Sequence, residues 1–300
     1  MSAIRVAAGG IDFEVFETAA GGGGTGERLA LCLHGFPEIA RSWQHQAPVL
    51  AALGYRVWAV NQRGYGGTTT PAKMQDYAVE RLMDDVANLI DASGATSVTL
   101  IAHDWGAIVA WLFATRRLRP LERLVIMNVP HPAVFRKRAT LKQVASSWYM
   151  AFFQLPRLPE IFVTSKGGAR VAATFKATST HPENFTREDL AAYRANIMRP
   201  GGATGMINWY RALIRGGGSV RQTKLGYPKI DVPTLMLWGE DDAFLTKATT
   251  VGTDDYVTNL TLRYLPGISH WVQQDAPREV NAMLEAFLTG KNVPEYATLV

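Results

Sequence analysis

Residues 100–111, LIAHDWGAIVAW, contain the local pattern that decides how the chain folds. The segment begins as an apolar strand, passes through a sharp turn and continues as the start of a helix. Asp104 stands at the turn, with the small residues Ala102 and Gly106 beside it in the sequence. Such a turn can hold its central side chain in a strained, exposed position above the carboxyl end of the strand. The segment therefore predicts a strand-turn-helix unit that presents a carboxylate.

Other apolar runs repeat the strand pattern along the chain. Residues 3–16 look like a hairpin around Gly9-Gly10, and GGGG at 21–24 is interpreted as a loop because no GK[ST] follows it. The later runs alternate largely with helical patterns, which is typical of a mostly parallel sheet with helices on both faces. The sequence therefore predicts an α/β fold. The further strands are expected at 29–33, 55–60, 98–103, 123–128, 233–238 and 260–265.

One interval interrupts the alternation. Residues 131–227 contain helical patterns, aromatic residues and scattered Pro and Gly, but no convincing buried strand. We expect this interval to be an inserted helical cap over one edge of the sheet. The core would then consist of residues 1–130 and 228–300. The helical patterns of the cap lie at 139–153, 168–178, 186–198 and 204–215.

Composition and charge indicate which kinds of partner the protein can bind. The 300 residues are 47% hydrophobic and 19% charged, as in an ordinary globular protein. The formal net charge of +5 could suit an anionic partner, but the basic residues form no long stripe and no known nucleic-acid motif. We expect a small-molecule substrate, no nucleic-acid partner and no membrane partner. Two short basic clusters are interpreted as solvated surface: Arg116, Arg117 and Arg119, and then Arg136, Lys137 and Arg138.

Cysteine and histidine usage excludes several further classes. The lone Cys32 cannot form an intramolecular disulfide, and its setting in LALCL favours a buried strand residue. The first residues lack the apolar core of a signal peptide, and no run approaches the roughly 20 apolar residues of a membrane span. A soluble cytoplasmic protein is expected. Six histidines and one cysteine show no metal-ligand spacing, so we expect neither a metal nor a cofactor. Monomer and homodimer both stay open.

Asp104 has two interpretations. It could simply cap the helix that follows, because Asp is among the best N-cap residues. It could also be a nucleophile, and the downstream sequence favours this role. Three acids, ending with Asp242, follow the apolar run and Gly239 in LMLWGEDDAF, and His270 follows the next run. Nucleophile, acid and histidine in this chain order are the α/β-hydrolase arrangement.

A more specific resemblance covers most of the chain. HGFP at 34–37, HDWGA at 103–107, LWGEDD at 237–242 and SHW at 269–271 together resemble the epoxide hydrolases of the α/β-hydrolase fold. RGYGG at 63–67 also resembles a loop of that family. The resemblance implies an enzyme that converts an epoxide and water to a vicinal diol.

The resemblance also implies a role for each site residue. A carboxylate such as Asp104 can displace the oxygen of an epoxide from a saturated carbon and form an alkyl ester. Water activated by His270 would then attack the ester carbonyl, with Asp242 orienting the imidazole. The backbone N–H groups of Phe36 and Trp105 would stabilise the resulting oxyanion.

Ring opening also needs a proton donor, which this family takes from two cap tyrosines. SWYMAFFQ and INWYRAL resemble the surroundings of those tyrosines, so the resemblance carries the role to Tyr149 and Tyr210. The alternative is that both are ordinary aromatic core residues of the cap. His34 and His103 flank the proposed site and are interpreted as residues that hold loops by hydrogen bonds.

Three alternatives stay open at this stage. Haloalkane dehalogenases share the aspartate elbow but typically carry HGNP, where this chain has Phe36. Fluoroacetate dehalogenases share HGFP but resemble HDRG at the elbow, where this chain has Trp105. A noncatalytic binding protein could keep the same fold and pocket. The epoxide hydrolase reading is preferred because the nucleophile, base, acid and candidate proton donors are all present.

The chain departs from the family pattern in small ways. Ala102 stands where a glycine is common at the elbow. Asn61, before Gln62 and Arg63, stands where an aspartate is often found. Asp241 adjoins Asp242, so the choice of Asp242 as the orienting acid depends on the family pattern.

Overall fold

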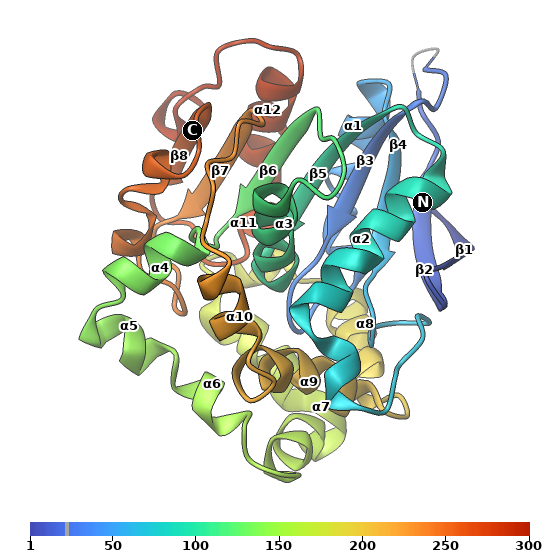
Figure 1. Cartoon of the computed structure of the whole chain (residues 1–300), viewed down its shortest axis with the longest axis vertical. Helices are drawn as coiled ribbons and strands as arrows, with labels where there is room; N and C mark the ends of the chain where they lie inside the picture. Colours follow the sequence, from blue (N-terminus) through green and yellow to red (C-terminus); the bar gives the residue numbers. More distant parts are fainter. Residues whose placement is uncertain (22–23) are drawn as a thin grey trace.

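The computed structural model describes residues 1–21 and 24–300. Its centre is an eight-stranded sheet with the strand order β1-β2-β4-β3-β5-β6-β7-β8 (Figure 1). β2 pairs antiparallel with β1 and with β4, and all other neighbouring strands pair in parallel. The strands are β1 (Ser2–Ala8), β2 (Ile11–Thr18), β3 (Arg28–Leu33), β4 (Arg56–Asn61), β5 (Ser97–His103), β6 (Arg123–Met127), β7 (Thr234–Gly239) and β8 (Leu260–Leu265).

Each expected strand is present, with ends shifted by one or two residues at most. The expected N-terminal hairpin is confirmed: β1 and β2 are joined by Gly9 and Gly10, whose φ angles are +57° and +78°. A two-residue turn with positive φ at both positions matches the twist of a hairpin, and glycine adopts it without a steric penalty. Gly22 and Gly23 of the expected glycine loop lie outside the described residues.

Helices cover both faces of the sheet, so the predicted α/β architecture is confirmed. In Figure 1, α2 (Val79–Ser93) and α3 (Asp104–Arg116) lie in front of the sheet, and α1 (Ala47–Ala52) and α12 (Pro277–Leu288) lie behind it. Alternate strand residues feed two separate hydrophobic cores, one on each face. Cys32 is buried in the rear core, as the sequence predicts.

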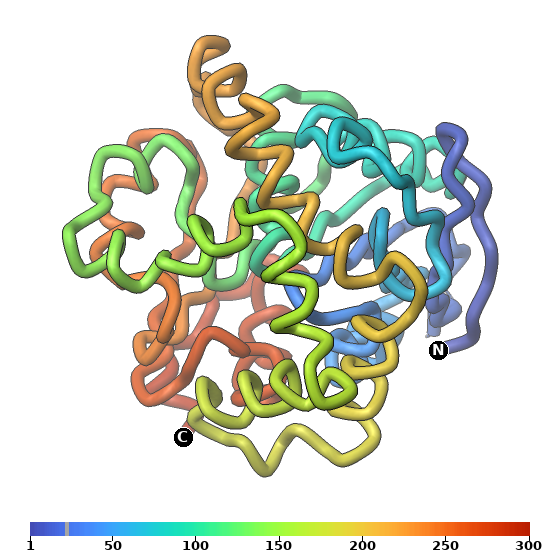
Figure 2. Tube along the Cα trace, turned by 90° about the horizontal axis from the view of Figure 1, so that it is seen from below, coloured from blue at the N-terminus to red at the C-terminus, as the bar shows by residue number. Residues whose placement is uncertain are grey.

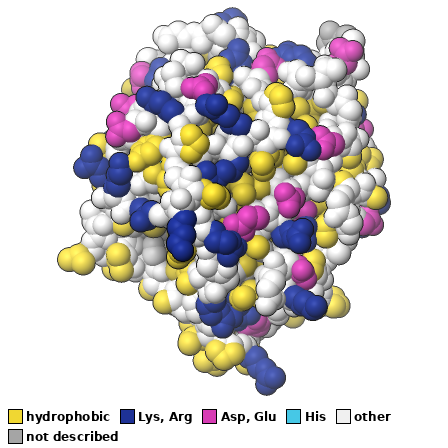
Figure 3. Space-filling model, in the orientation of Figure 1, with side chains coloured by type: hydrophobic (Ala, Val, Ile, Leu, Met, Phe, Trp, Pro, Cys, Tyr) yellow, Lys and Arg dark blue, Asp and Glu magenta, His cyan; other side chains and the backbone are white. Residues whose placement is uncertain are grey.

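The remaining helices mostly gather at the carboxyl end of the strands, and Figure 2 shows them from below, in front of the sheet. They are α4 (Pro132–Arg138), α5 (Leu141–Ser146), α6 (Trp148–Phe152), α7 (Leu158–Thr178), α8 (Arg187–Met198), α9 (Gly202–Ile214), α10 (Gly218–Lys224) and α11 (Val272–Asp275). Short 3₁₀ helices occur at Ala40–Trp43, Met74–Tyr77, Pro182–Asn184, Lys247–Thr250, Thr253–Asp255 and Tyr296–Thr298. Figure 3 shows hydrophobic side chains at the lower left and lower edges of the molecule, where Figure 1 places α5, α6 and the cap below them.

The helical patterns of residues 131–227 were only partly predictable. The helix expected at 139–153 is divided into α5 and α6 around Ser147, which is not helical. α7 begins at Leu158, ahead of the pattern, and is interrupted at 165–168, where Gly167 and Gly168 have positive φ angles. α4 and α10 were not expected.

We propose that residues 131–227 form one cap domain inserted between the core segments 1–130 and 228–300. Every regular element between 131 and 227 is helical. Within the two described ranges, no helix combines the length and apolarity needed to cross a membrane.

The RGYGG loop connects the core to the cap. The side chain of Arg63 makes two hydrogen bonds to buried Asp85, at 2.7 and 2.6 Å. Its carbonyl accepts a hydrogen bond of 3.0 Å from the indole of Trp209 in α9. Gly64 and Gly205 allow close contact, because a Cβ on Gly205 would lie 3.3 Å from the Cα of Gly64. This contact fixes α9 above the strand ends.

The turn between β5 and α3 brings the helix unusually close to β3. The N–H of Gly106 donates to the carbonyl of His34 at 3.1 Å. A Cβ on Gly106 would lie 2.4 Å from the carbonyl oxygen of Leu33, a separation that only glycine avoids. Gly106 therefore sets the height of the α3 N-terminus above the sheet.

We predict that Gly106→Ala lowers the free energy of unfolding by about 1–3 kcal/mol, because the added methyl must push α3 away from β3. Urea denaturation measures the change. Gly218→Ala is the matched control, since a Cβ there makes only ordinary contacts of 3.4 Å or more, and its stability should stay within roughly 0.5 kcal/mol of the parent protein. Equal stability of Gly106→Ala and the control would contradict the packing argument.

Candidate active site

Asp104 occupies a strained backbone position between β5 and α3. Its φ is +46°, in the left-handed region that few residues other than glycine adopt. Gly35 lies against it, and a Cβ on Gly35 would come within 2.3 Å of the Asp104 Cβ. Two glycines, Gly35 and Gly106, thus make room for the turn. The strain directs the carboxylate out of the turn, so the predicted elbow geometry is present.

Two backbone N–H groups near Asp104 are the predicted oxyanion donors, and one of them contacts its carboxylate. The N–H of Phe36 donates to Asp104 Oδ1 at 2.7 Å. Trp105 is the second residue of α3, so its N–H belongs to the first helical turn, whose N–H groups have no acceptor within the helix. Its side chain packs beneath the cap, with ring centroids 5.6 Å from Trp209 and 4.7 Å from Tyr210.

His270 lies between two carboxylates. Its Nε2 is 3.5 Å from Asp104 Oδ2, and its Nδ1 is 2.7 Å from Asp242 Oδ2. The His270 and Asp242 side chains are almost completely buried, whereas 18% of the Asp104 side chain is exposed. Of the two carboxylates, that of Asp104 is therefore the one that a molecule in the cavity can reach.

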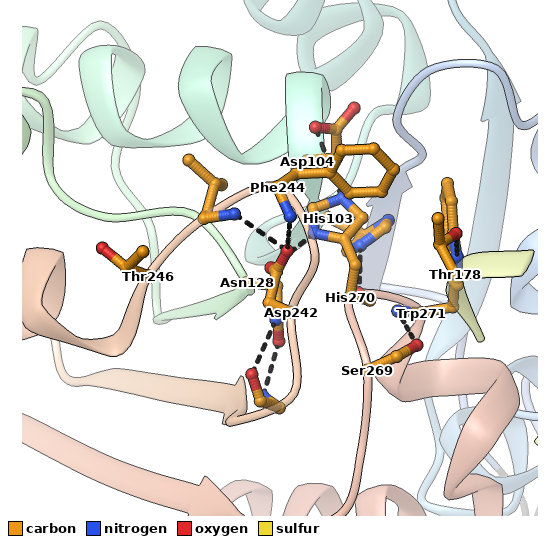
Figure 4. A network of polar contacts seen from close by, with 12 residues as sticks. His103, Asp104, Asn128, Thr178, Asp242, Phe244, Thr246, Ser269, His270 and Trp271 are labelled. Atoms are coloured by element: carbon orange, nitrogen blue, oxygen red, sulfur yellow. Dashed lines mark hydrogen bonds and ion pairs between the residues drawn. The ribbon is translucent and has the colours of Figure 1, made fainter. Parts of the chain in front are cut away.

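The carboxylate beside His270 Nδ1 belongs to Asp242, the residue that the resemblance proposes as the acid. Its Oδ1 accepts hydrogen bonds from the backbone N–H groups of Phe244 and Leu245 at 2.7 and 2.9 Å. Asn128 donates to Oδ2 at 2.8 Å, and Figure 4 shows these groups converging on the Asp242 carboxylate. Asp241 is exposed. Asp242 is thus fixed in position beside the imidazole.

The charges of the site are strongly coupled. Burial alone would lower the pKa of His270, but the negative charges of Asp242 and Asp104 raise its pKa to about 10. Burial alone would raise the pKa of Asp104, but His270 and the N–H of Phe36 hold it below its ordinary value. Asp104 is therefore an anion beside a cationic imidazole at neutral pH.

Both predicted cap tyrosines reach the same cavity. Tyr149 lies on α6 and Tyr210 on α9, with ring centroids 6.1 Å apart. Burial, followed by the negative charge of Asp104, raises the pKa of each phenol well above its ordinary value. Both hydroxyls therefore keep their protons and can donate hydrogen bonds.

One cavity of about 160 Å³ contains Asp104, His270 and both tyrosines in its walls. The rest of its lining is largely aromatic or aliphatic and includes Phe36, Phe153, Phe244 and Trp271. An apolar enclosure of this kind strengthens electrostatic interactions and suits an apolar small molecule.

Two flanking histidines have the loop-holding role that the sequence suggested. His34 Nδ1 is 2.8 Å from the carbonyl oxygen of Gly35, and its Nε2 accepts from the N–H of Gln62 at 3.3 Å. His103 bridges buried Glu38, at 2.8 Å, and the carbonyl oxygen of His270, at 2.9 Å.

Sequence reasoning missed two supporting residues, Asn128 and Glu38, and gave no role to a third, Asn61. Asn128 follows β6 with a φ of +47° and holds Asp242. Glu38 holds His103, and Asn61 accepts from the N–H of Ala40 at 2.7 Å. Asn128 could have been found, because a polar residue directly after a buried parallel strand lies at the edge where the site forms.

Comparisons with known proteins agree with this geometry. The family described as alpha/beta hydrolase fold matches residues 31–277. Epoxide hydrolase 2 of Caenorhabditis elegans is 38% identical over 265 residues, which are 87% of this chain and 73% of the relative. Epoxide hydrolase 4 of Mus musculus is 37% identical, over 89% of this chain and 74% of the relative.

A solved structure of an epoxide hydrolase is also similar to this chain. The crystal structure of epoxide hydrolase A from Mycobacterium thermoresistibile superposes with a TM-score of 0.82 at 28% identity, covering 98% of this chain and 99% of that chain. The fold, the similarity over most of the sequence and the arrangement of the site agree: the chain belongs to the epoxide hydrolases of the α/β-hydrolase fold family.

Proposed function

We propose that this enzyme hydrolyses an epoxide to a vicinal diol in two steps, through a covalent alkyl ester on Asp104. The observation that carries the proposal is the carboxylate at the elbow, in contact with His270 and sharing one apolar cavity with two tyrosines. The relatives and the solved structure described above are named epoxide hydrolases, which disfavours the dehalogenase alternatives.

In the first step, an oxygen of Asp104 attacks one epoxide carbon and the C–O bond of the ring breaks. A serine hydroxyl would suit attack on a carbonyl, whereas a carboxylate can displace oxygen from a saturated carbon and leave an ester that water can cleave. The hydroxyls of Tyr149 and Tyr210 bind the departing oxygen, and one of them gives it a proton. Ester formation removes the negative charge of Asp104, which is one cause of their raised pKa values. The phenols therefore become better acids as the alkoxide forms.

In the second step, His270 removes a proton from water, and the hydroxide attacks the carbonyl carbon of the ester. The backbone N–H groups of Phe36 and Trp105 stabilise the oxyanion. Collapse of this intermediate breaks the bond between the carbonyl carbon of Asp104 and the substrate oxygen. The diol is released and the side chain of Asp104 is restored. The diol oxygen that leaves takes the proton held by His270, and the carboxyl group of Asp104 then gives its proton to the imidazole, which restores the starting ion pair.

The pKa of His270 explains the order of these steps. With Asp104 ionised, the imidazole has a pKa of about 10 and is cationic at neutral pH. A cation cannot act as a base. Ester formation neutralises Asp104 and removes part of what stabilises the imidazolium, so the pKa of His270 falls. After the ester has formed, the imidazolium gives its proton to the tyrosinate left by ring opening, which restores the phenol. The base therefore becomes available only after the intermediate has formed.

The first prediction separates the two steps by mutation. Asp104→Ala should reduce turnover by roughly 10⁴-fold or more, because no ester can form. His270→Gln should still form the ester but fail to hydrolyse it. Mass spectrometry of His270→Gln after exposure to an aromatic epoxide should show one adduct, mapped to Asp104. Sustained multiple turnover by either variant would contradict the scheme.

The second prediction concerns the proton donors. Tyr149→Phe and Tyr210→Phe should each slow ester formation by roughly 10²-fold, the usual contribution of a general acid. Rapid-quench single-turnover experiments measure this rate. Tyr193→Phe is the matched control, because Tyr193 is a buried cap tyrosine that does not line the cavity. If neither active-site variant differed from this control, the tyrosine assignment would be wrong.

The third prediction uses pH. His270 lowers the pKa of Asp104, whereas burial raises it. Replacing the cationic imidazole by glutamine should therefore raise the pKa of Asp104, and the acid limb of ester formation in His270→Gln should move to higher pH. Single-turnover rates across the acid range measure the shift. Tyr149→Phe, which removes no charge, should leave the limb in place, and an unshifted limb in His270→Gln would disprove the charge coupling.

A further inference from the structure

The cap carries a concentration of positive charge that the mechanism does not use. Between Arg136 and Lys176 the chain has eight of its 31 Lys and Arg residues but only one of its 26 acids, Glu160. The remaining residues therefore have a slight formal excess of acid. All eight cations, which we call the cap cations, are exposed.

The cap cations have no acidic partners within the described part of the chain. Glu160, the one acid among them, is bound to Arg211 of α9 at 2.5 Å. The basic cluster after α3 differs, because Arg117 and Arg119 pair with Asp231 at 2.5 Å and Asp91 at 2.6 Å. The positive charge of the cap is thus available to a partner.

The same part of the cap exposes large apolar side chains. Seven of the fourteen exposed large hydrophobic residues of the described chain lie between 141 and 162, and we call them the apolar cap face. Leu141 is 90% exposed, Val144 63%, Trp148 60% and Ile161 63%. Figure 2 shows this segment crossing the underside of the molecule, nearest the viewer. A concentration of this kind on one side marks an interaction surface.

The apolar cap face continues into the active-site cavity. Trp148 and Phe162 are exposed on the surface and also line the cavity, and Arg170, one of the cap cations, stands over the Phe162 ring at 4.2 Å. An apolar small molecule bound at this face therefore lies beside the cavity.

Against the expectation from composition that the protein has no membrane partner, we propose that the apolar cap face docks on an anionic lipid bilayer. Exposed Leu, Val, Ile and Trp side chains among Lys and Arg residues are the composition of segments that lie in a membrane interface without crossing it. The cap cations would contact the lipid headgroups, whose negative surface potential attracts basic residues.

The charge pattern favours lipid over two other occupants. A symmetric second copy would place cap cations against cap cations, because the same patch meets itself in a two-fold dimer. A nucleic acid would offer phosphates but no apolar phase for Leu141, Val144 and Ile161, and interfaces with nucleic acid are more polar than those between proteins. An anionic bilayer satisfies both the cations and the apolar side chains.

Vesicle flotation tests the proposal with the full chain. The protein should float with vesicles of two parts phosphatidylcholine to one part phosphatidylglycerol, and should float far less with phosphatidylcholine alone. High salt should release it, because screening shortens the range of the headgroup charge. The assay needs no epoxide, so its outcome is independent of the proposed reaction.

Two pairs of variants test the two parts of the surface. Leu141→Glu/Val144→Glu should abolish flotation, and Lys142→Glu/Arg157→Glu should weaken binding on the order of tenfold or more. The matched controls are Val220→Glu/Leu225→Glu, which alters exposed apolar residues of and after α10, and Lys291→Glu near the C-terminus; both should bind like the parent. Turnover of a water-soluble epoxide should be unchanged in Leu141→Glu/Val144→Glu, which shows that the variant is folded.

Three outcomes would overturn the proposal. The parent protein could fail to float at low salt, or the control variants could lose binding as fully as the cap variants. Sedimentation velocity could instead reveal a dimer that Leu141→Glu/Val144→Glu dissociates, without vesicle binding by the parent. The apolar cap face would then be an interface between two copies of the chain.

Discussion

The left-handed backbone of Asp104 is the constraint on which the rest of the site depends. An ordinary N-terminal helical residue would keep its carboxylate beside the first N–H groups of the helix, as an N-cap does. The φ of +46° instead presents the carboxylate to the cavity and to His270. This geometry is possible because Gly35 and Gly106 leave no side chains in the way. The cost of the strained turn is met by the sheet and helix packed on either side.

The charge of Asp104 then connects groups from distant parts of the chain. It raises the pKa of His270, Tyr149 and Tyr210 together. In an apolar cavity these effects are larger than they would be in water. In the proposed reaction, converting the carboxylate to a neutral ester changes all three at once: the pKa of His270 falls, so its imidazole can lose its proton and act as a base, and the phenols become more acidic. One covalent event therefore prepares the proton transfers that complete the reaction.

The sequence predicted best what depends on local pattern. Parallel strands buried on both faces are continuous apolar runs, so β3 to β8 were located closely, and the carboxyl-edge positions of Asp104, Asp242 and His270 followed. The helices of the cap were harder to predict because tertiary contacts, rather than local sequence, determine where they end. The interrupted α7 is an example. Tyr149 and Tyr210 depended on resemblance, since an aromatic residue on a helix does not reveal whether it faces a cavity. Glu38 was missed because a buried polar side chain is explained only by the partner it meets in space. Asn128 was also missed, although its place directly after β6 indicated the edge where the site forms.

The segment inserted after β6 and the core contribute different groups to the site. The proposed nucleophile, base, acid and oxyanion donors come from strand ends of the core, whose spacing the sheet fixes. The tyrosines, much of the apolar wall and the exposed cap surface come from residues 131–227, which the core contacts at the loop of Arg63 and Gly64. Substitutions on the outer side of the cap can therefore change what reaches the cavity without moving the three charged groups. Substitutions at the RGYGG loop would tilt α9 and displace Tyr210 from Asp104, so this contact couples the proposed chemistry to the position of the cap.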